Sequence, residues 1–334
     1  EHAGMAMIET INLCKEYGSL IALNNLNLTI ERGDCFGFIG PNGAGKTTTI
    51  KIIATLLKPT RGQAMIDGLT VGFENRKIRP IIGYVPDFMG EYEDTVVSEY
   101  LEFFAAAYSI HGSDRKKVVG DVLELTDLTY KANAQVSSLS RGMQQRLSVA
   151  RVLLHDPKVL LMDEPASGLD PRARIEMREL LKELKRMGKT IIISSHILHE
   201  LAELCNVVGI IERGELLFNG PVREVMRRAR LNHTVHVAVL DRTAEAAELL
   251  RKPPGVATVA IDEASDVVGF GETAGFQTNS DNRLITVTMD ESGAQNVSDL
   301  PNRLINAGFR MTHFSEESVN LETAFMRLTQ GLVQ

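Results

Sequence analysis

The chain contains no tryptophan, only three cysteines and no long apolar segment. The cysteines, Cys14, Cys35 and Cys205, are widely separated, which fits neither a disulfide framework nor the paired spacing of a zinc site. No stretch approaches the ~18 consecutive apolar residues that a membrane-spanning helix needs, and the first residues lack the apolar core of a signal peptide. We therefore expect a protein of a reducing cytoplasm, with the cysteines as small core residues.

An excess of positive charge is also missing. The formal net charge is −7, so there is no general electrostatic reason to expect nucleic acid as a partner. Local basic runs remain candidate contact points, but a solvated helix face is the favoured interpretation. An example is the run of Arg223, Arg227, Arg228 and Arg230. Apolar residues make up 44% of the 334 residues, enough to fill one large domain and a smaller one, or two of middling size.

The apolar pattern of the first two thirds of the chain predicts an α/β fold. Strands are predicted at 8–13, 26–30 and 35–39, and again at 159–162 and 191–194. The run 35–39 is short and apolar, as expected for a strand buried on both faces. Because helices alternate with these strands, the core is predicted to be a parallel sheet.

Helices are predicted after the first strands, within 87–157 and after Asp170. The first stops before the turn signal at 59–62 and is predicted to bury Ile50, Ile53, Leu56 and Leu57 on one face. Residues 87–157 form a helical block inserted into the α/β core, and the last helix of this block starts with Ser140 as its N-cap. Asp170 is predicted to cap a helix with Pro171 at its first position. The buried stripe of that helix is predicted to contain Met177, Leu180, Leu181 and Leu184.

A second domain is predicted beyond a boundary near residues 220–232. Residues 221–231 are predicted to form an arginine-rich linker helix. The segment 232–334 reads as strand, helix, strand, strand, helix, strand and a last helix at 321–328. This βαββαβ order predicts a small α+β sandwich of the split-βαβ type. The polar stretch 263–282 is expected to be a loose loop.

The most specific chemical motif is a glycine-rich loop between a predicted strand and a predicted helix. Residues Gly40, Pro41, Asn42, Gly43, Ala44, Gly45, Lys46 and Thr47, followed by Thr48, match the pattern G-x-x-x-x-G-K-[ST]. Glycines let backbone N–H groups point at phosphate oxygens, and the helix N-terminus adds its positive dipole end. Lys46 is predicted to neutralise the β- and γ-phosphates, and Thr47 to bind Mg²⁺. The loop therefore predicts a site for Mg-ATP.

Two acids follow the apolar strand at 159–162. Asp163 and Glu164 have no good explanation as core residues, because unpaired buried carboxylates are costly. At the carboxyl end of a strand beside the phosphate loop, Asp163 is predicted to hold the Mg²⁺ shell. Glu164 is then placed to orient and deprotonate an attacking water. The two motifs together predict an ATPase.

Over about residues 8–220 the chain resembles the ATP-binding subunits of ABC (ATP-binding cassette) transporters. Leu139-Ser140-Arg141-Gly142-Met143 looks like the LSGGQ signature of that family, and Ser167-Gly168-Leu169-Asp170 looks like its D-loop. His196 matches the switch histidine, and Tyr17 stands where an aromatic residue stacks on adenine. The resemblance implies a P-loop NTPase cassette at 7–220. Its parts would be a parallel-sheet core, an antiparallel β subdomain and a helical subdomain at about 87–157.

The resemblance also implies partners. Two cassettes, identical or related, would form a head-to-tail dimer around two ATP molecules, with the Lys46 loop of each facing Ser140, Arg141 and Gly142 of the other. Asp170 would belong to this nucleotide site, and His196 would contact the γ-phosphate or the water. A separate integral-membrane permease would hold the chain at the cytoplasmic face of the cell membrane. Residues 321–329 are similar to the ending of bacterial export ATPases for drugs, antibiotics or polysaccharides, which implies export.

Two residues depart from the family pattern. Asp87 stands where the family usually has Gln, and it is expected to reach Mg²⁺ because a carboxylate is a hard oxygen ligand. Arg141 replaces a Gly of the signature, and Met143 replaces the usual Gln. We therefore expect Arg141 of one subunit to offset the charge of Asp87 or of the γ-phosphate across the dimer.

The start of the helical block is rich in aromatic residues. Phe88 and Tyr92 fall in a predicted loop and are the better candidates for contact with a permease, because aromatic residues are enriched at interfaces. Tyr100, Phe103 and Phe104 have helical spacing and are expected in the core. Two other functions remain open at this point: a soluble ABC ATPase acting on ribosomes or DNA, and an ATPase regulated by a ligand of residues 232–334.

Overall fold

The structure is a computed structural model that describes residues 6–90, 94–195, 201, 203–225, 233–261, 283–289 and 297–316. The chain divides into two compact units, residues 1–223 and 224–334, and each unit is described by itself. Several predicted features lie outside the described residues, namely Tyr92, His196, most of the linker helix, the loop 263–282 and the last helix.

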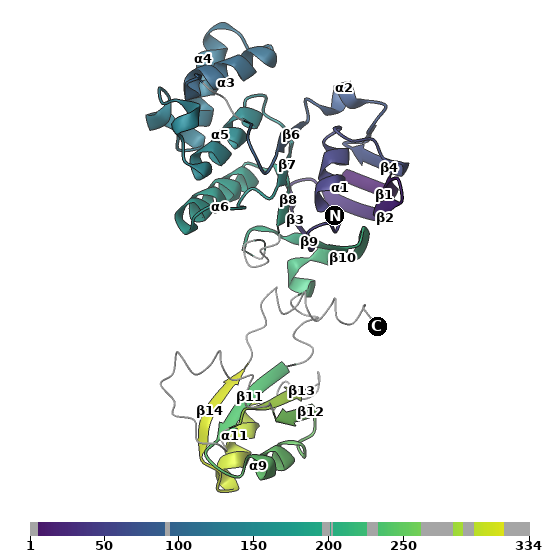
Figure 1. Ribbon diagram of the computed structural model, residues 1–334, viewed down its shortest axis with the longest axis vertical. Coiled ribbons are helices and arrows are strands. Elements are labelled where there is room, and N and C mark those ends of the chain that lie inside the picture. The colour runs from purple at the N-terminus through teal and green to yellow at the C-terminus, as the bar shows by residue number, and fades with distance from the viewer. Residues whose placement is uncertain are drawn as a thin grey trace. The chain divides into compact units, whose positions relative to one another are not determined.

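A six-stranded sheet forms the centre of the first unit (Figure 1). Its strands, in spatial order, are β10 (Glu215–Pro221), β9 (Val207–Glu212), β3 (Cys35–Ile39), β8 (Thr190–Ser195), β7 (Val159–Asp163) and β6 (Ile82–Val85). All pairings are parallel except that of β10 with β9. Strands β3, β7 and β8 are buried throughout, which explains their apolar sequences. Their carboxyl ends share one edge of the sheet, where the predicted phosphate loop and acids follow.

A second, antiparallel sheet lies on the other side of helix α1 (Lys46–Ile53). Its strands, in spatial order, are β2 (Leu20–Glu31), β1 (Ala6–Tyr17), β4 (Arg61–Ile66) and β5 (Leu69–Thr70). Helix α1 contacts β2 and β4 of this sheet and β7 and β8 of the central one, and the three elements share one hydrophobic core. The predicted α/β class with an antiparallel β subdomain is confirmed.

The prediction for the end of α1 was wrong. The helix stops at Ile53, and Thr55 has the left-handed φ of 62°. Ile50 and Ile53 are buried as expected, whereas Leu56 is 62% exposed because the chain has left the helix before reaching it. A short helix, α2 (Asn75–Ile78), lies between β5 and β6.

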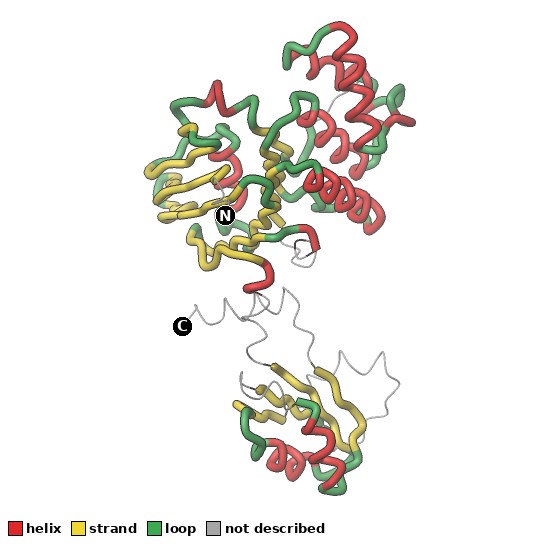
Figure 2. The backbone as a smooth tube through the Cα atoms, turned by 180° about the vertical axis from the view of Figure 1, so that it is seen from behind, coloured by secondary structure: helices red, strands yellow, loops and turns green. Residues whose placement is uncertain are grey.

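The helical block stands apart from the strands of this unit (Figure 2). It contains α3 (Val97–Ala107), α4 (Gly112–Leu125), the 3₁₀ turns η1 (Thr129–Lys131) and η2 (Val136–Ser138), and α5 (Arg141–Leu153). The expectation that Phe103 is a core residue was wrong, since its side chain is 68% exposed. The buried stripe of α3 is Val97, Tyr100, Leu101 and Ala105, and Phe103 points away from it.

Helix α6 (Pro171–Arg186) joins the helical block to the sheet. Asp170 caps it by accepting a hydrogen bond from the Ala173 N–H, and the four predicted residues of its stripe are buried. Two contacts hold α5 to α6. A Cβ on Gly142 would lie 2.6 Å from that of Ala173, so only glycine fits there. One turn further along, buried Arg146 lies 3.2 Å from Glu176.

The second unit has the predicted strand and helix order. Its elements are β11 (His233–Val239), α9 (Thr243–Leu250), β12 (Val256–Ile261), β13 (Ile285–Met289), α11 (Asp299–Asn306) and β14 (Met311–Glu316). The sheet is antiparallel, in the spatial order β12, β13, β11 and β14, and α9 and α11 pack with one of its faces in a single core. This is a split-βαβ sandwich of the ferredoxin-like type.

Candidate functional site

The glycine-rich loop connects the buried strand β3 to the N-terminus of α1. Gly43 and Gly45 have positive φ angles of 82° and 111°. A Cβ on Gly45 would lie 2.8 Å from the Ala22 carbonyl oxygen, and one on Gly40 would lie 2.2 Å from that of Ile211. Side chains are therefore excluded at these positions. The result is a backbone loop next to the first N–H groups of a helix, an arrangement suited to phosphate.

The Lys46 side chain is buried inside this loop. Its Nζ donates hydrogen bonds to the carbonyl oxygens of Gly40 at 2.6 Å and Pro41 at 3.1 Å, and it lies 3.7 Å from Glu164. Burial lowers the pKa of the Lys46 ammonium, while the carboxylates of Glu164 and Asp163 oppose that shift. The lysine thus joins the two motifs that the sequence singled out, the glycine-rich loop and the acids after β7.

Asp163 and Thr47 form a set of oxygen donors at the carboxyl end of β7. The Thr47 hydroxyl donates to Oδ1 of Asp163 at 2.9 Å, and Asp163 itself is 5% exposed. Mg²⁺ prefers oxygen ligands and is commonly held by one or two carboxylates together with substrate phosphates. No cluster of three or more His, Cys, Asp or Glu suited to a metal occurs among the described residues. The pair therefore fits a magnesium ion that is shared with a bound nucleotide.

Ser194 is a member of this cluster that the sequence analysis missed. It is fully buried at the end of β8, and its Oγ donates to Oδ1 of Asp163 at 2.7 Å. The same Oγ accepts the backbone N–H of Glu164 at 2.9 Å. The only sequence signal was a hydroxyl at the end of an apolar strand. The register of β7 and β8 places Asp163 opposite Ser194 and so brings that hydroxyl to the carboxylate.

Glu164 has a strained backbone. Its φ of 50° lies in the left-handed region, which costs a residue with a side chain roughly 1 to 3 kcal/mol. The hydrogen bond to Ser194 holds the backbone there, and the carboxylate is directed toward Lys46. A partly exposed carboxylate held beside a phosphate-binding lysine can orient a water and accept its proton.

The signature segment lies at the N-terminus of α5. Ser140 is the N-cap, as predicted, and its Oγ accepts the Met143 N–H at 3.3 Å. Ser140 and Arg141 are exposed, and Gly142 is buried against α6. The surface at the start of α5 therefore consists of Ser140 and Arg141.

Asp87 and Arg141 meet within one chain. The Arg141 guanidinium lies 3.6 Å from the Asp87 carboxylate, and both side chains are about half exposed. A Cβ on Gly168 would lie 2.6 Å from Arg141 Cζ, so the guanidinium also packs on the D-loop. The pair within one chain is a contact that the sequence analysis did not anticipate, and the expected pairing of Arg141 across a dimer stays a prediction. Gln145 adds a 3.2 Å hydrogen bond to the Pro86 carbonyl oxygen.

The structure also relates Asp87 to the metal-binding pair. Burial, with the carboxylates of Asp163 and Asp87 nearby, raises the pKa of Tyr84 on β6 to about 12. Asp87 follows the carboxyl end of β6, which pairs in parallel with β7, so it comes after the same edge of the sheet at which Asp163 ends β7.

The remaining predicted residues have varied environments. Tyr17 is 47% exposed, and the Lys15 ammonium lies 5.0 Å from its ring centre. In the glycine-rich loop, Pro41 and Asn42 are exposed, Ala44 is buried and Thr48 is half-buried. One carboxylate oxygen of Asp170 accepts the Ala173 N–H and caps α6. Asp170 therefore has a structural role in addition to any contact with a nucleotide.

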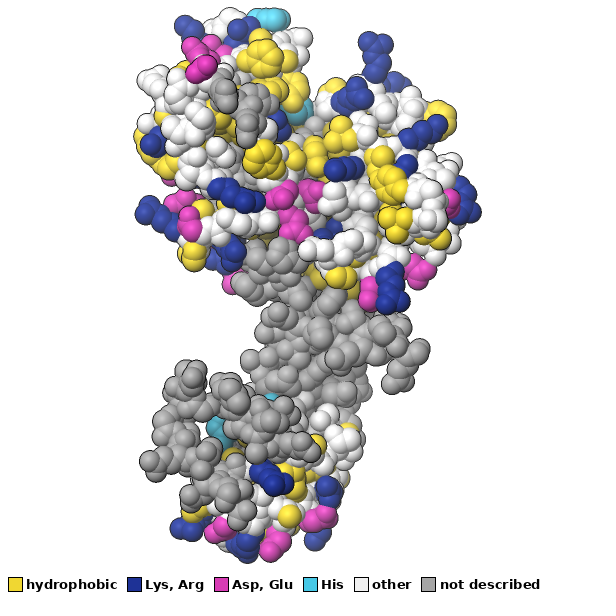
Figure 3. Space-filling model, in the orientation of Figure 1, with side chains coloured by type: hydrophobic (Ala, Val, Ile, Leu, Met, Phe, Trp, Pro, Cys, Tyr) yellow, Lys and Arg dark blue, Asp and Glu magenta, His cyan; other side chains and the backbone are white. Residues whose placement is uncertain are grey.

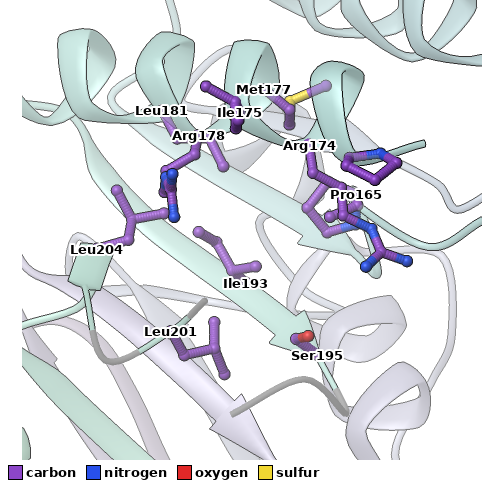
Figure 4. A pocket seen from close by; sticks show the side chains of 12 residues that line it. Pro165, Arg174, Ile175, Met177, Arg178, Leu181, Ile193, Ser195, Leu201 and Leu204 are labelled. Atoms are coloured by element: carbon purple, nitrogen blue, oxygen red, sulfur yellow. The ribbon is translucent and has the colours of Figure 1, made fainter. Parts of the chain in front are cut away.

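A pocket lies between α6 and β8, and Pro165 and Ala166, which follow Glu164, form part of its lining (Figure 4). Pro165, Ile175, Leu181 and Ile193 give it mainly apolar walls, and Arg174 and Arg178 reach into it from α6. The described lining contains no carboxylate. The pocket therefore adds no catalytic group to the cluster around Asp163.

No helix among the described residues is long and apolar enough to cross a membrane.

Comparisons with known proteins agree with this geometry. The family model for ABC transporters matches residues 23–167. The Nod factor export ATP-binding protein I of Ralstonia nicotianae is 32% identical, with 95% of this chain and 92% of that protein aligned. The bacitracin transport ATP-binding protein BcrA of Bacillus licheniformis is 41% identical, over 67% of this chain and 72% of that protein. The solved dimeric, post-hydrolysis ATP-binding cassette MJ0796, bound to ADP and Pi, matches with a TM-score of 0.58. It is 28% identical and aligns over 65% of this chain and 99% of that one.

Proposed function

The chain belongs to the ATP-binding proteins of ABC transporters, and we propose that it powers export through a separate membrane permease. As a member of this family it binds and hydrolyses ATP. Support for export comes from the relatives. One of them is named as a Nod factor export ATP-binding protein, and its alignment covers 95% of this chain and 92% of that protein. The observation that carries the proposal is the cluster of Lys46, Thr47, Asp163 and Glu164 around one phosphate-binding loop.

In the proposed reaction, water attacks the γ-phosphorus of ATP, the bond from this phosphorus to the bridging β-phosphate oxygen breaks, and ADP leaves. Glu164 orients this water and takes its proton, while Lys46 and the loop N–H groups neutralise the charge that develops on the phosphate oxygens. His196, which lies outside the described residues, is proposed to contact the γ-phosphate or the water. Tyr17 is proposed to stack on the adenine.

Magnesium is proposed as the metal of this reaction. Thr47 and Asp163 would hold it, with Asp87 as a further oxygen donor, and the ion would offset charge on the β- and γ-phosphates. The hydrogen bond between Thr47 and Asp163 supports this assignment, because it brings two hard oxygen ligands together.

The working unit is proposed to be a head-to-tail dimer of this chain with a second copy or a related cassette. The exposed N-terminus of α5, with Ser140, Arg141 and Gly142, would complete the nucleotide site of the other subunit, and Asp170 would lie at the same interface. Helix N-terminal N–H groups suit the γ-phosphate that such a site contains. The similar cassette MJ0796, a dimer bound to ADP and Pi, supports this arrangement.

The permease is proposed to dock on the helical block. Phe88, in the loop after β6, is 65% exposed, and Phe103 on α3 is 68% exposed. Hydrophobic side chains are visible on the surface of this block (Figure 3). Exposed aromatic residues of this kind are typical of interface cores. Docking there would hold the chain at the cytoplasmic face of the membrane and connect the permease to the loop with Asp87.

Affinity purification from detergent-solubilised native membranes tests the proposal. The tagged chain would carry Glu164→Gln to slow hydrolysis, and we expect a stoichiometric multi-span membrane protein to copurify. Adding Phe88→Asp should reduce its recovery at least about fivefold, whereas Phe73→Asp, at an exposed phenylalanine outside the helical block, is the matched control. Recovery with ribosomes, with DNA or without any partner would contradict the proposal and leave the ATPase standing.

A further inference from the structure

We propose that Arg141 exchanges partners when ATP binds, leaving Asp87 of its own chain for the γ-phosphate held by the second subunit. This inference rests on the sandwich dimer of the proposed function. It goes further by giving Arg141 two alternative positions and by connecting the two nucleotide sites through a single chain.

The first position is the one in the structure. The guanidinium lies 3.6 Å from the Asp87 carboxylate and against Gly168, where no larger residue would leave it room. At 3.6 Å the ion pair is loose, and both side chains are about half exposed to water. An exposed pair of this kind is weak and is readily replaced by a stronger anion.

The second position follows from the helix that carries Arg141. This residue is at the first position of α5, directly after the N-cap Ser140. A positive charge is unfavourable there, because the helix N-terminus is itself positive, and a nearby anion is needed to offset both. Asp87 supplies one negative charge. A nucleotide triphosphate supplies more, and guanidinium groups bind phosphate oxygens in bidentate geometry.

The exchange would couple the two sites of the dimer. Asp87 follows the carboxyl end of β6, which pairs in parallel with β7, and β7 ends at Asp163, where Thr47 also meets it, so Asp87 is assigned to the chain's own nucleotide site. Arg141 belongs to the signature segment, which completes the other site. When Arg141 binds the ATP held by the second subunit, it would leave Asp87. Asp87 would then turn toward Thr47 and Asp163 of its own chain. Binding at one site would therefore favour completion of the second.

Dimerisation of the Glu164→Gln protein, measured by sedimentation over a series of ATP concentrations, tests the exchange. Asp87→Asn should lower the ATP concentration for half-maximal dimer about two- to fivefold, the range expected for an exposed ion pair. Arg141→Gln should raise it by a similar factor, and Arg141→Lys should restore part of the loss. Because the pair is exposed, the effect of Asp87→Asn should shrink at high salt.

A double-mutant cycle separates the ion pair from any other role of Asp87. In the Arg141→Gln background, Asp87→Asn should no longer lower the ATP requirement, because its benefit acts through Arg141. The matched control is another exposed pair, Arg186 and Glu183 on α6, where Arg186→Gln and Glu183→Gln should leave the midpoint unchanged.

The outcomes distinguish the two proposals. If the parent protein dimerises with ATP and Asp87→Asn changes the midpoint by the same factor in both backgrounds, the exchange is wrong and the sandwich stands. If the parent binds ATP and remains monomeric at every concentration, the sandwich and the exchange are both overturned.

Discussion

The Oγ of Ser194 and the Oγ of Thr47 both donate hydrogen bonds to the same oxygen of Asp163, at 2.7 and 2.9 Å. One oxygen thus gathers hydroxyls from β8 and from α1, while the Ser194 hydroxyl also holds the Glu164 N–H. The acid at the end of β7 is therefore fixed in position before any ligand arrives, which lowers the cost of forming a metal site.

Replacing Ser194 by Ala tests this arrangement. The change leaves the buried Glu164 N–H without its acceptor, so we expect the free energy of unfolding in urea to fall by about 1 to 3 kcal/mol. The Mg²⁺ concentration for half-maximal ATPase should rise, because Asp163 loses one of its two hydrogen bonds from hydroxyls. Ser137→Ala, at an exposed serine of η2, is the control. Equal Mg²⁺ requirements in both variants would contradict the role given to Ser194.

Lys46→Met is expected to abolish ATP binding without weakening the nucleotide-free fold. Folding lowers the pKa of Lys46, so the folded protein holds this proton less tightly than the unfolded chain does. The charged lysine therefore costs stability at neutral pH, and stability recovers as the pH rises from the lowered pKa toward the ordinary value of 10.5. Urea unfolding at about pH 7.5 should show equal or higher stability in the variant. The increase in the free energy of unfolding between about pH 7.5 and about pH 10 should be smaller in the variant than in the parent, because the variant lacks the lysine.

His155 is predicted to make the fold sensitive to acid. Burial lowers the pKa of this histidine, which hydrogen-bonds to the Ile82 carbonyl oxygen through Nε2 and stacks on Tyr108. Because the unfolded chain takes up the proton first, the stabilisation is complete above the ordinary pKa of 6.5 and is lost as the pH falls below it. His155→Gln should reduce the difference in Tm between about pH 7.5 and pH 5.5. His111→Gln, at an exposed histidine, should leave that difference unchanged.

Gly168→Ala tests the position of Arg141 without any nucleotide. The new Cβ would meet the guanidinium at 2.6 Å, and the φ of 65° is unfavourable for alanine. We expect a loss of about 1 to 3 kcal/mol in the free energy of unfolding. In the Arg141→Gly background only the backbone strain remains, so the loss should be smaller. The same loss in both backgrounds would mean that Arg141 does not rest on Gly168 in solution.

Local chemistry explains which parts could be predicted from the sequence. The glycine-rich loop, the acids after β7 and the caps Ser140 and Asp170 depend on neighbours within a few residues, and the structure has each of these elements where it was expected. The end of α1 was misjudged because apolar Leu56 continues the helical pattern beyond the last helical residue. Phe103 was misjudged because its helical spacing from Tyr100 suggested a shared buried face, whereas the buried stripe of α3 continues through Leu101 and Ala105.

Contacts between distant segments explain the rest. Ser194 could be recognised only from the register of β7 and β8, since nothing in its own neighbourhood distinguishes it from other strand hydroxyls. The contact of Arg141 with Asp87 within one chain could not be foreseen for the same reason. The opposite charges of Asp87 and Arg141, at two departures from the family pattern, suggest a pair. Only the packing of α5 beside the loop after β6 shows that the two side chains meet within one chain.

The two contacts between α5 and α6 have a mechanical consequence. Gly142 touches Ala173, and one turn later Arg146 reaches Glu176, so the helices are attached at two points rather than one. Two attachments oppose a pivot of one helix against the other more strongly than a single contact would. A swing of the helical block would therefore carry the first turns of α6 with it, and the moving body would extend past residue 157 to include the D-loop. The flexible seam would then lie between α6 and the central sheet, beside Glu164.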